Sequence, residues 1–131
     1  MRMLFPRVLQ AATVGVALAV SAPAAFAAPS NEWTVELQGR SKVAGEVVLS
    51  LTPAEGKATR VTVPIPAATN HEAAAVMVSN VMTERLGTGT YHVEIDGIDE
   101  VKVISVDRAR TFDLAVERNT TDGLAVDVDR D

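Results

Sequence analysis

The sequence contains no cysteine, few aromatic residues and fewer basic than acidic residues. The absence of cysteine excludes disulfides, thiolate metal sites, a cysteine nucleophile and a lipid anchor attached to cysteine. The chain has 17 Asp and Glu against 12 Lys and Arg, whereas a general nucleic-acid-binding protein needs an excess of basic residues. A length of 131 residues is typical of a single domain.

Aromatic residues make up only 4% of the chain. Three of them lie beyond residue 27, namely Trp33, Tyr91 and Phe112, and each stands at an apolar position of an alternating segment. We expect all three in the core, where they offer no stacking platform for sugars or nucleobases.

The first 27 residues have the three-part layout of a secretory signal peptide. Arg2 and Arg7 give a positive start, an apolar run covers residues 8–20, and residues 25–27 fit the A-x-A cleavage pattern. A run of 13 residues is shorter than the roughly 20 that a membrane-spanning helix needs. We therefore predict cleavage after Ala27 and a periplasmic or secreted location.

Cleavage at this point removes two arginines and no acidic residue, so residues 28–131 carry a net charge of −7. These residues are expected to form one acidic domain with no membrane span and no lipid anchor. A domain of about 100 residues buries enough surface to fold without disulfides.

Apolar and polar residues alternate through most of residues 28–131, which is the period of a strand with one buried face. Six or seven strands are predicted, centred on residues 33–37, 46–51, 61–65, 91–95, 101–103, 112–116 and 124–128. The first two are expected to form a hairpin. Pro64 and Pro66 lack a backbone donor and place the end of the third strand at a sheet edge or exit. Asp96-Gly97 indicates a hairpin turn.

Residues 70–86 are predicted to form the only helix. Thr69 is the candidate N-cap, with Glu72 three residues later as its capping-box partner, and Gly87 stands where a C-terminal cap is expected. Apolar residues recur at helical spacing and form one stripe, which consists of Ala74, Met77, Val78, Val81 and Met82.

The predicted fold class is α+β, with an antiparallel sheet of six or seven strands covered on one face by a single amphipathic helix. A partly closed barrel or a sandwich is the alternative.

His92, Glu94 and Asp96 are candidate metal ligands or acid–base partners, because alternate strand residues project from the same face. Along a strand the three positions span about 13 Å, which is too far for one ion without a ligand from another element. We expect a solvated strand face. His71, in the first turn of the helix, is expected to be a surface residue.

Two further segments are rich in acidic residues. Residues 127–131 have the spacing of the opening of a calcium loop, but the glycine and the glutamate that complete such a loop are missing, so an acidic, frayed terminus is predicted. Glu94, Asp96, Asp99 and Glu100 crowd around Gly97. Such a hairpin suits a basic partner or a cation, or protects the sheet edge and maintains solubility.

No serine stands in a G-x-S-x-G context, and no glycine-rich loop precedes the helix. We therefore predict no catalytic residue, no cofactor and no enzymatic activity.

From the helix onward, the residues 91–97, 101–104, 112–116 and 123–126 follow one another in a recurrent hydrophobic rhythm. Over about the last 60 residues the chain resembles small helix-plus-hairpin modules of bacteriophage tail components and bacterial surface proteins. The resemblance implies a fold and carries over no functional residue, and the signal peptide departs from the tail-component pattern.

The sequence therefore favours an exported, non-enzymatic domain that binds a protein, because strand edges and polar strand faces can add to another chain. The alternatives are a metal-binding or enzymatic accessory protein that uses the face of His92, Glu94 and Asp96, and a structural subunit of a surface assembly.

Overall fold

The structure of the protein is a computed structural model that describes residues 29–131, so the predicted signal peptide lies outside the described residues. The elements are β3 (Glu32–Gly39), β4 (Gly45–Pro53), β5 (Thr59–Ile65), α1 (His71–Leu86), β6 (Tyr91–Asp96), β7 (Glu100–Ser105), β8 (Phe112–Asn119) and β9 (Leu124–Arg130). Seven strands and one helix in this part of the chain confirm the predicted α+β fold. No helix in residues 29–131 is both long enough and apolar enough to cross a membrane.

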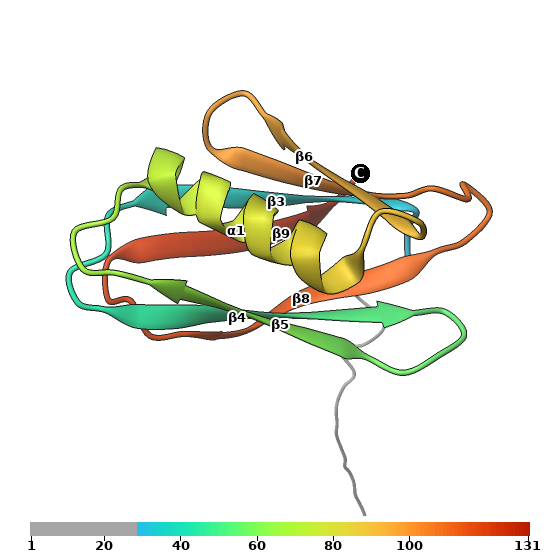
Figure 1. Cartoon of the computed structure of the whole chain (residues 1–131), viewed down its shortest axis with the longest axis horizontal. Coiled ribbons are helices and arrows are strands. Elements are labelled where there is room, and N and C mark those ends of the chain that lie inside the picture. Colours follow the sequence, from blue (N-terminus) through green and yellow to red (C-terminus); the bar gives the residue numbers. More distant parts are fainter. Residues whose placement is uncertain (1–28) are drawn as a thin grey trace, which may run out of the picture.

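The strands form two antiparallel sheets that face each other, with the orders β6-β7-β3-β9 and β5-β4-β8 (Figure 1). The strands are thus arranged as in the sandwich alternative and are not joined in one continuous sheet. Seven strands side by side would be about 30 Å wide, whereas a helix is about 10 Å across. One helix therefore cannot cover them, and two sheets that pack face to face can cover each other.

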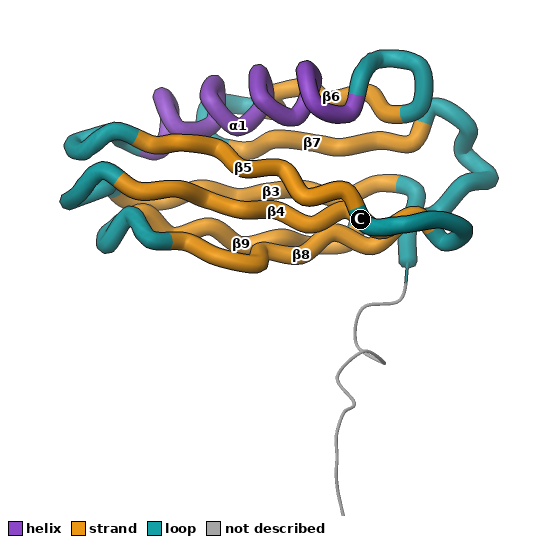
Figure 2. The backbone as a smooth tube through the Cα atoms, turned by 60° about the horizontal axis from the view of Figure 1, so that its bottom comes forward, coloured by secondary structure: helices purple, strands orange, loops and turns teal. Residues whose placement is uncertain are grey.

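Helix α1 lies along one open side of the sandwich, where it packs mainly against the edge strands β5 and β6 (Figure 2). It also contacts β3 and β7. The helix therefore closes the space between the two sheets on this side.

The predicted hairpin of the first two strands is wrong. β3 pairs with β7 and β9, and β4 pairs with β5 and β8. The connection crosses from one sheet to the other, and buried Ser41 anchors it by accepting the backbone N–H of Thr69 at 2.8 Å. The hairpin of β6 and β7 around Gly97 is confirmed, as is the edge position of the Pro64 strand.

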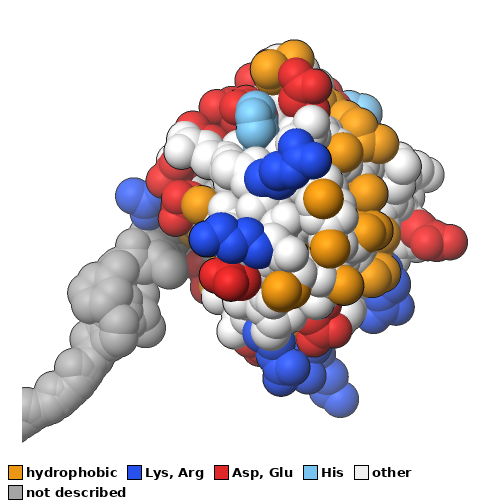
Figure 3. Space-filling model, turned by 90° about the vertical axis from the view of Figure 1, so that its left-hand side faces the viewer, with side chains coloured by type: hydrophobic (Ala, Val, Ile, Leu, Met, Phe, Trp, Pro, Cys, Tyr) orange, Lys and Arg blue, Asp and Glu red, His pale blue; other side chains and the backbone are white. Residues whose placement is uncertain are grey.

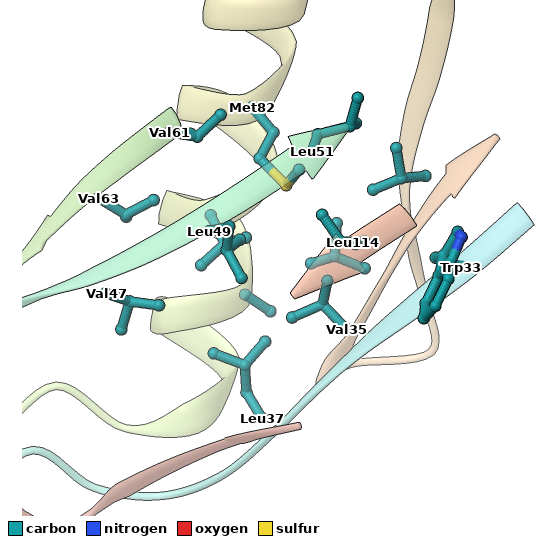
Figure 4. Packing of buried hydrophobic residues seen from close by; sticks show 14 of the residues in the cluster. Trp33, Val35, Leu37, Val47, Leu49, Leu51, Val61, Val63, Met82 and Leu114 are labelled. Carbon is teal, nitrogen blue, oxygen red and sulfur yellow. The ribbon is translucent and has the colours of Figure 1, made fainter. Parts of the chain in front are cut away.

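The inner faces of both sheets and one face of the helix form the core (Figure 4). Trp33, Tyr91 and Phe112 are all buried there, as predicted. Phe112 lies between the other two rings, with ring centroids 6.5 Å from Trp33 and 5.1 Å from Tyr91. The indole Nε1 of Trp33 donates a hydrogen bond to the carbonyl oxygen of Phe112 at 2.8 Å, which ties β3 to the start of β8.

The N-cap of the helix lies one residue later than predicted. Asn70 is the N-cap, and its side-chain oxygen accepts the backbone N–H of Ala73 at 2.9 Å. Thr69 is buried instead, and its hydroxyl donates to the carbonyl oxygen of Pro66 at 2.7 Å. The predicted end is confirmed, because Gly87 adopts a φ of 76° and donates its N–H to the carbonyl of Thr83.

The apolar stripe of the helix is narrower than its pattern indicates. Ala74, Val78 and Met82 are fully buried, whereas Met77 and Val81 are half-buried at the sides of the stripe. The helix meets the sandwich along the gap between two edge strands, so only its central row of side chains enters the core.

Candidate interaction surface

The outer face of the four-stranded sheet gathers carboxylates from all four strands. Its register sets Glu36 beside Glu100 on one side and beside Asp127 on the other. Continuing this alternation across the sheet defines what we term the acidic face, whose eight carboxylate residues are Glu32, Glu36, Glu94, Asp96, Glu100, Asp127, Asp129 and Asp131. Nearly half of the 17 acidic residues of the chain thus lie on one surface.

The outer face of the three-stranded sheet differs, because two of its three acidic residues, Glu46 and Glu117, contact arginines, and within residues 29–131 only Asp113 does not. Arg60 contacts Glu117 at 2.6 Å, and Arg118 contacts Glu46 at 3.4 Å. An end-on view shows acidic side chains along the upper left of the molecule and lysine and arginine side chains at its centre and bottom (Figure 3). The two outer faces therefore differ in charge balance.

Lys102 stands between Thr34 and Glu94 on the acidic face and compensates part of its charge. Its Nζ lies 2.9 Å from Oδ2 of Asp131, 3.2 Å from Oε2 of Glu32 and 3.3 Å from the hydroxyl of Thr34. The hydrogen bond with Asp131 raises the pKa of Lys102 most, and the bond with Glu32 adds to it. Burial opposes ionisation of Asp131, but hydrogen bonds from Lys102 and Thr34 outweigh it and lower the pKa of that carboxyl.

We expect Lys102→Met to lower the free energy of unfolding by about 1–2 kcal/mol, because it removes three polar contacts. Among the described residues, it leaves Asp131 with the hydroxyl of Thr34 and Glu32 with the more distant Arg108. Urea unfolding measures this loss, and added salt should reduce it by screening the remaining repulsion. Lys57→Met, at an exposed site in the β4–β5 turn, is the matched control and should change stability little. Equal losses for both variants would contradict the role of Lys102.

Glu36 and Glu100 are neighbours in the row of the acidic face that also holds Asp96 and Asp127. A hydrogen bond shared with Glu100 is the main cause that raises the pKa of Glu36 above its usual value of 4.5, and repulsion by Glu100, Asp129 and Asp127 adds to it. A hydrogen bond between two carboxyl groups needs one proton, so proton uptake relieves this cluster. Removal of this proton therefore leaves Glu36 and Glu100 as two like charges side by side.

This cluster predicts a pH-dependent effect of Glu36→Gln. A carboxyl with a raised pKa in the folded state favours folding at low pH, and its contribution is lost as the pH rises through that pKa. The variant should therefore be more stable than the unchanged protein at neutral pH, and the difference should vanish below the usual pKa of 4.5. Thermal unfolding at several pH values measures it. A difference that is constant with pH would contradict the shared proton.

The three candidate ligands on β6 all project from the acidic face, as predicted. Nε2 of His92 and Oε1 of Glu94 are 2.8 Å apart, so these two side chains contact each other at the surface. Asp96 lies further along the strand and faces Glu100. Within the part of the chain that the structure describes, no three His, Asp or Glu side chains are grouped so that they could hold a metal ion.

His71 lies partly exposed at the start of α1, and its Nδ1 is 3.7 Å from Oδ2 of Asp99. Asp99 thus turns from the β6–β7 hairpin towards the helix. Of the four acidic residues predicted around this hairpin, the other three, Glu94, Asp96 and Glu100, belong to the acidic face.

The prediction of a frayed acidic terminus is wrong. Residues 124–130 form β9, which pairs with β3 over its whole length. Beyond the strand, Asp131 donates its backbone N–H to the carbonyl of Glu32 at 3.1 Å and binds Lys102 through its side chain. Strand alternation sends Asp127 and Asp129 outward, so the segment is part of the acidic face and has no loop that could surround calcium.

The sequence pattern predicts each strand of the acidic face, but it does not show which strands lie next to one another. Glu32, Glu36 and Lys102 stand at polar positions of alternating segments, and no local motif marks them as functional candidates. Only the strand order places β3 between β7 and β9. Since these strands are far apart in the sequence, no local spacing reveals the cluster.

An open groove of about 460 Å³ separates the edge strands β8 and β9 on the side opposite α1. It is lined by Trp33, Asp113, Leu114, Ala115, Val128, Asp129 and Arg130. Asp129 belongs to both the groove and the acidic face, so the two features are continuous.

Comparison with known proteins identifies no relative: no protein-family model matches the sequence, and no curated protein matches it. The resemblance to tail and surface modules therefore stays a prediction.

Proposed function

We propose that the protein is an exported, non-enzymatic domain that binds a basic surface of a partner protein through its acidic face. The observation that carries this proposal is the gathering of eight carboxylates on one sheet face. In the described part of the chain, two cations compensate part of this charge: Lys102 stands on the face itself, and Arg108 reaches Glu32 from a loop at 3.8 Å.

The charge of this face is costly to the isolated protein. Glu36 and Glu100 lie side by side, and the pKa of Glu36 is raised mainly by its hydrogen bond with Glu100 and further by their mutual repulsion. A basic partner would relieve this repulsion on binding, and a one-signed surface also accelerates the approach of such a partner. Among the ion pairs of residues 29–131, only Glu32 and Asp131 of the acidic face have a lysine or arginine partner, whereas both glutamates on the outer face of the other sheet have arginine partners.

Export is supported by the layout of residues 1–27. N-terminal sequencing of the protein purified from its native cells should yield a chain that begins with Ala28. An intact N-terminus in the cytoplasmic fraction would overturn this part of the proposal.

The binding role can be tested with two variants that carry the same change in charge. In the first, three carboxylates of the acidic face are neutralised: Glu94→Gln, Asp127→Asn and Asp129→Asn. In the control, three exposed carboxylates on other surfaces are neutralised: Glu55→Gln, Glu72→Gln and Glu84→Gln. Each protein is used to capture partners from envelope and medium fractions of the native cells, and a captured protein is then purified for measurement of its Kd.

We expect a basic partner whose affinity falls by about tenfold or more in the acidic-face variant and changes little in the control variant. The affinity should also weaken as ionic strength rises. A partner that binds both variants equally, or whose binding is insensitive to salt, would contradict the proposal.

A further inference from the structure

The groove between β8 and β9 is bordered by two strand edges that no backbone hydrogen bond joins within residues 29–131. The backbone of Phe112 on β8 points away from β4, because it exchanges both hydrogen bonds with Ser30. Antiparallel ladders alternate, so the backbone of Leu114 points the same way, into the groove. Asp131 donates to Glu32, hence the backbone of Val128 points away from β3 and also into the groove.

The other edges are less open. The β5 edge carries Pro64, which has no backbone donor, and α1 packs against both β5 and β6. At β8, Ser30 already occupies the first position of the edge. The β9 edge beside the groove is therefore the place in the described structure where an extended chain can best add to a sheet.

We propose that this groove binds an extended peptide segment in which basic and apolar residues alternate, and that the segment adds to β9 as a fifth strand of the four-stranded sheet. This inference rests on the proposed function and specifies how the partner binds. Side chains of an added strand alternate between the two faces of the sheet. One set would lie beside Asp127 and Asp129, and the other would enter the groove near Val128 and Trp33.

The charges of the groove favour this occupant. Two carboxylates line it, Asp129 from the acidic face and Asp113 from the other sheet, against one cation, Arg130, so its lining is acidic on balance. One carboxylate oxygen of Asp113, Oδ1, is buried without a hydrogen-bond partner. This carboxylate adds to the negative charge that Asp129 brings to the groove, which favours a basic segment.

A second copy of this chain fits the groove poorly. The edge strands β6 and β9 carry acidic side chains on the face that would meet Asp127 and Asp129, so like charges would lie opposite each other. The β5 edge carries the basic Arg60, but Pro64 has no backbone N–H to donate, so this edge cannot form a complete ladder with β9 of a second copy.

The test uses residues 28–131, which contain every described element, and three capped synthetic heptapeptides. The first peptide alternates lysine and valine, the second has the same composition with lysines and valines clustered, and the third is the first with alternate amides N-methylated. Trp33 is the only tryptophan of the chain and lines the groove, so its fluorescence reports binding at this place.

We expect the alternating peptide to change the Trp33 fluorescence and to bind at least about tenfold more tightly than the clustered and N-methylated peptides. Asp129→Lys should weaken its binding, whereas Asp96→Lys, at the opposite edge of the same face, should have a much smaller effect.

Equal affinities for all three peptides, equal effects of the two variants, or a dimer of the protein that the peptide dissociates would overturn the inference. If a basic partner binds the acidic face but no peptide enters the groove, the inference fails and the proposed function stands. If neither binds, both fail.

Discussion

Replacing Met82 by aspartate should lower the free energy of unfolding by at least about 4 kcal/mol. Met82 is completely buried, and its side chain extends from α1 towards Leu49 and Leu51 of β4 in the three-stranded sheet (Figure 4). The substitution loses this packing and places a carboxylate among apolar side chains that offer it no partner. A domain of this size has only about 5–15 kcal/mol of stability, so the variant should be largely unfolded or close to it.

Met77→Asp is the control for Met82→Asp, because it makes the same substitution five residues earlier in the same helix. Met77 is half-buried, so its carboxylate can reach water, and the expected loss is about 1–2 kcal/mol. Chemical denaturation of both variants gives the comparison. Equal losses would mean that α1 does not pack on the sandwich through the row that contains Met82.

Gly39→Ala should lower the free energy of unfolding by about 2–4 kcal/mol, which is a large effect for the addition of one methyl group. Gly39 ends β3 with a φ of 87°, a conformation that side chains with a Cβ atom rarely adopt. A Cβ atom at this position would also collide with the carbonyl oxygen of Gly123. That carbonyl cannot move freely, because it accepts the backbone N–H of Arg40 at 3.2 Å.

Gly87→Ala separates the two causes. Gly87 also has a positive φ, of 76°, but a Cβ atom there would meet nothing within 4 Å. Only the backbone strain remains, so the loss should be about 1 kcal/mol. Thermal unfolding of the two variants tests the difference. If Gly39→Ala is no more costly than Gly87→Ala, the close approach of β3 to the β8–β9 turn is absent.

Local patterns in the sequence predict the elements of this fold well and their assembly less well. The helix is predicted to within one residue, because its apolar stripe and Gly87 are local signals. Its N-cap is missed, since Thr69 and Asn70 are both capable of capping and the contact of Thr69 with Ser41 is a tertiary one. The hairpin of the first two strands is mispredicted because a connection such as residues 40–44 can either return a strand in the same sheet or carry it to a facing sheet.

The acidic face shows the same limit. His92, Glu94 and Asp96 share one strand, so their common face follows from alternation alone. Asp127 and Asp129 alternate in the same way, but nothing in the sequence shows that their strand is separated from that of His92 by β7 and β3. Strand order is set by long-range packing, and therefore the charge of a whole sheet face cannot be read from spacing.

The most direct test of the acidic face as the binding surface is to map amide and carboxylate chemical shifts by NMR while the purified partner is added. We predict that the largest changes fall on the outward residues of β3, β6, β7 and β9, and that the carboxyl signals of Glu36 and Asp129 are among them. Changes concentrated on α1 or on the outer face of the β5-β4-β8 sheet would contradict the account.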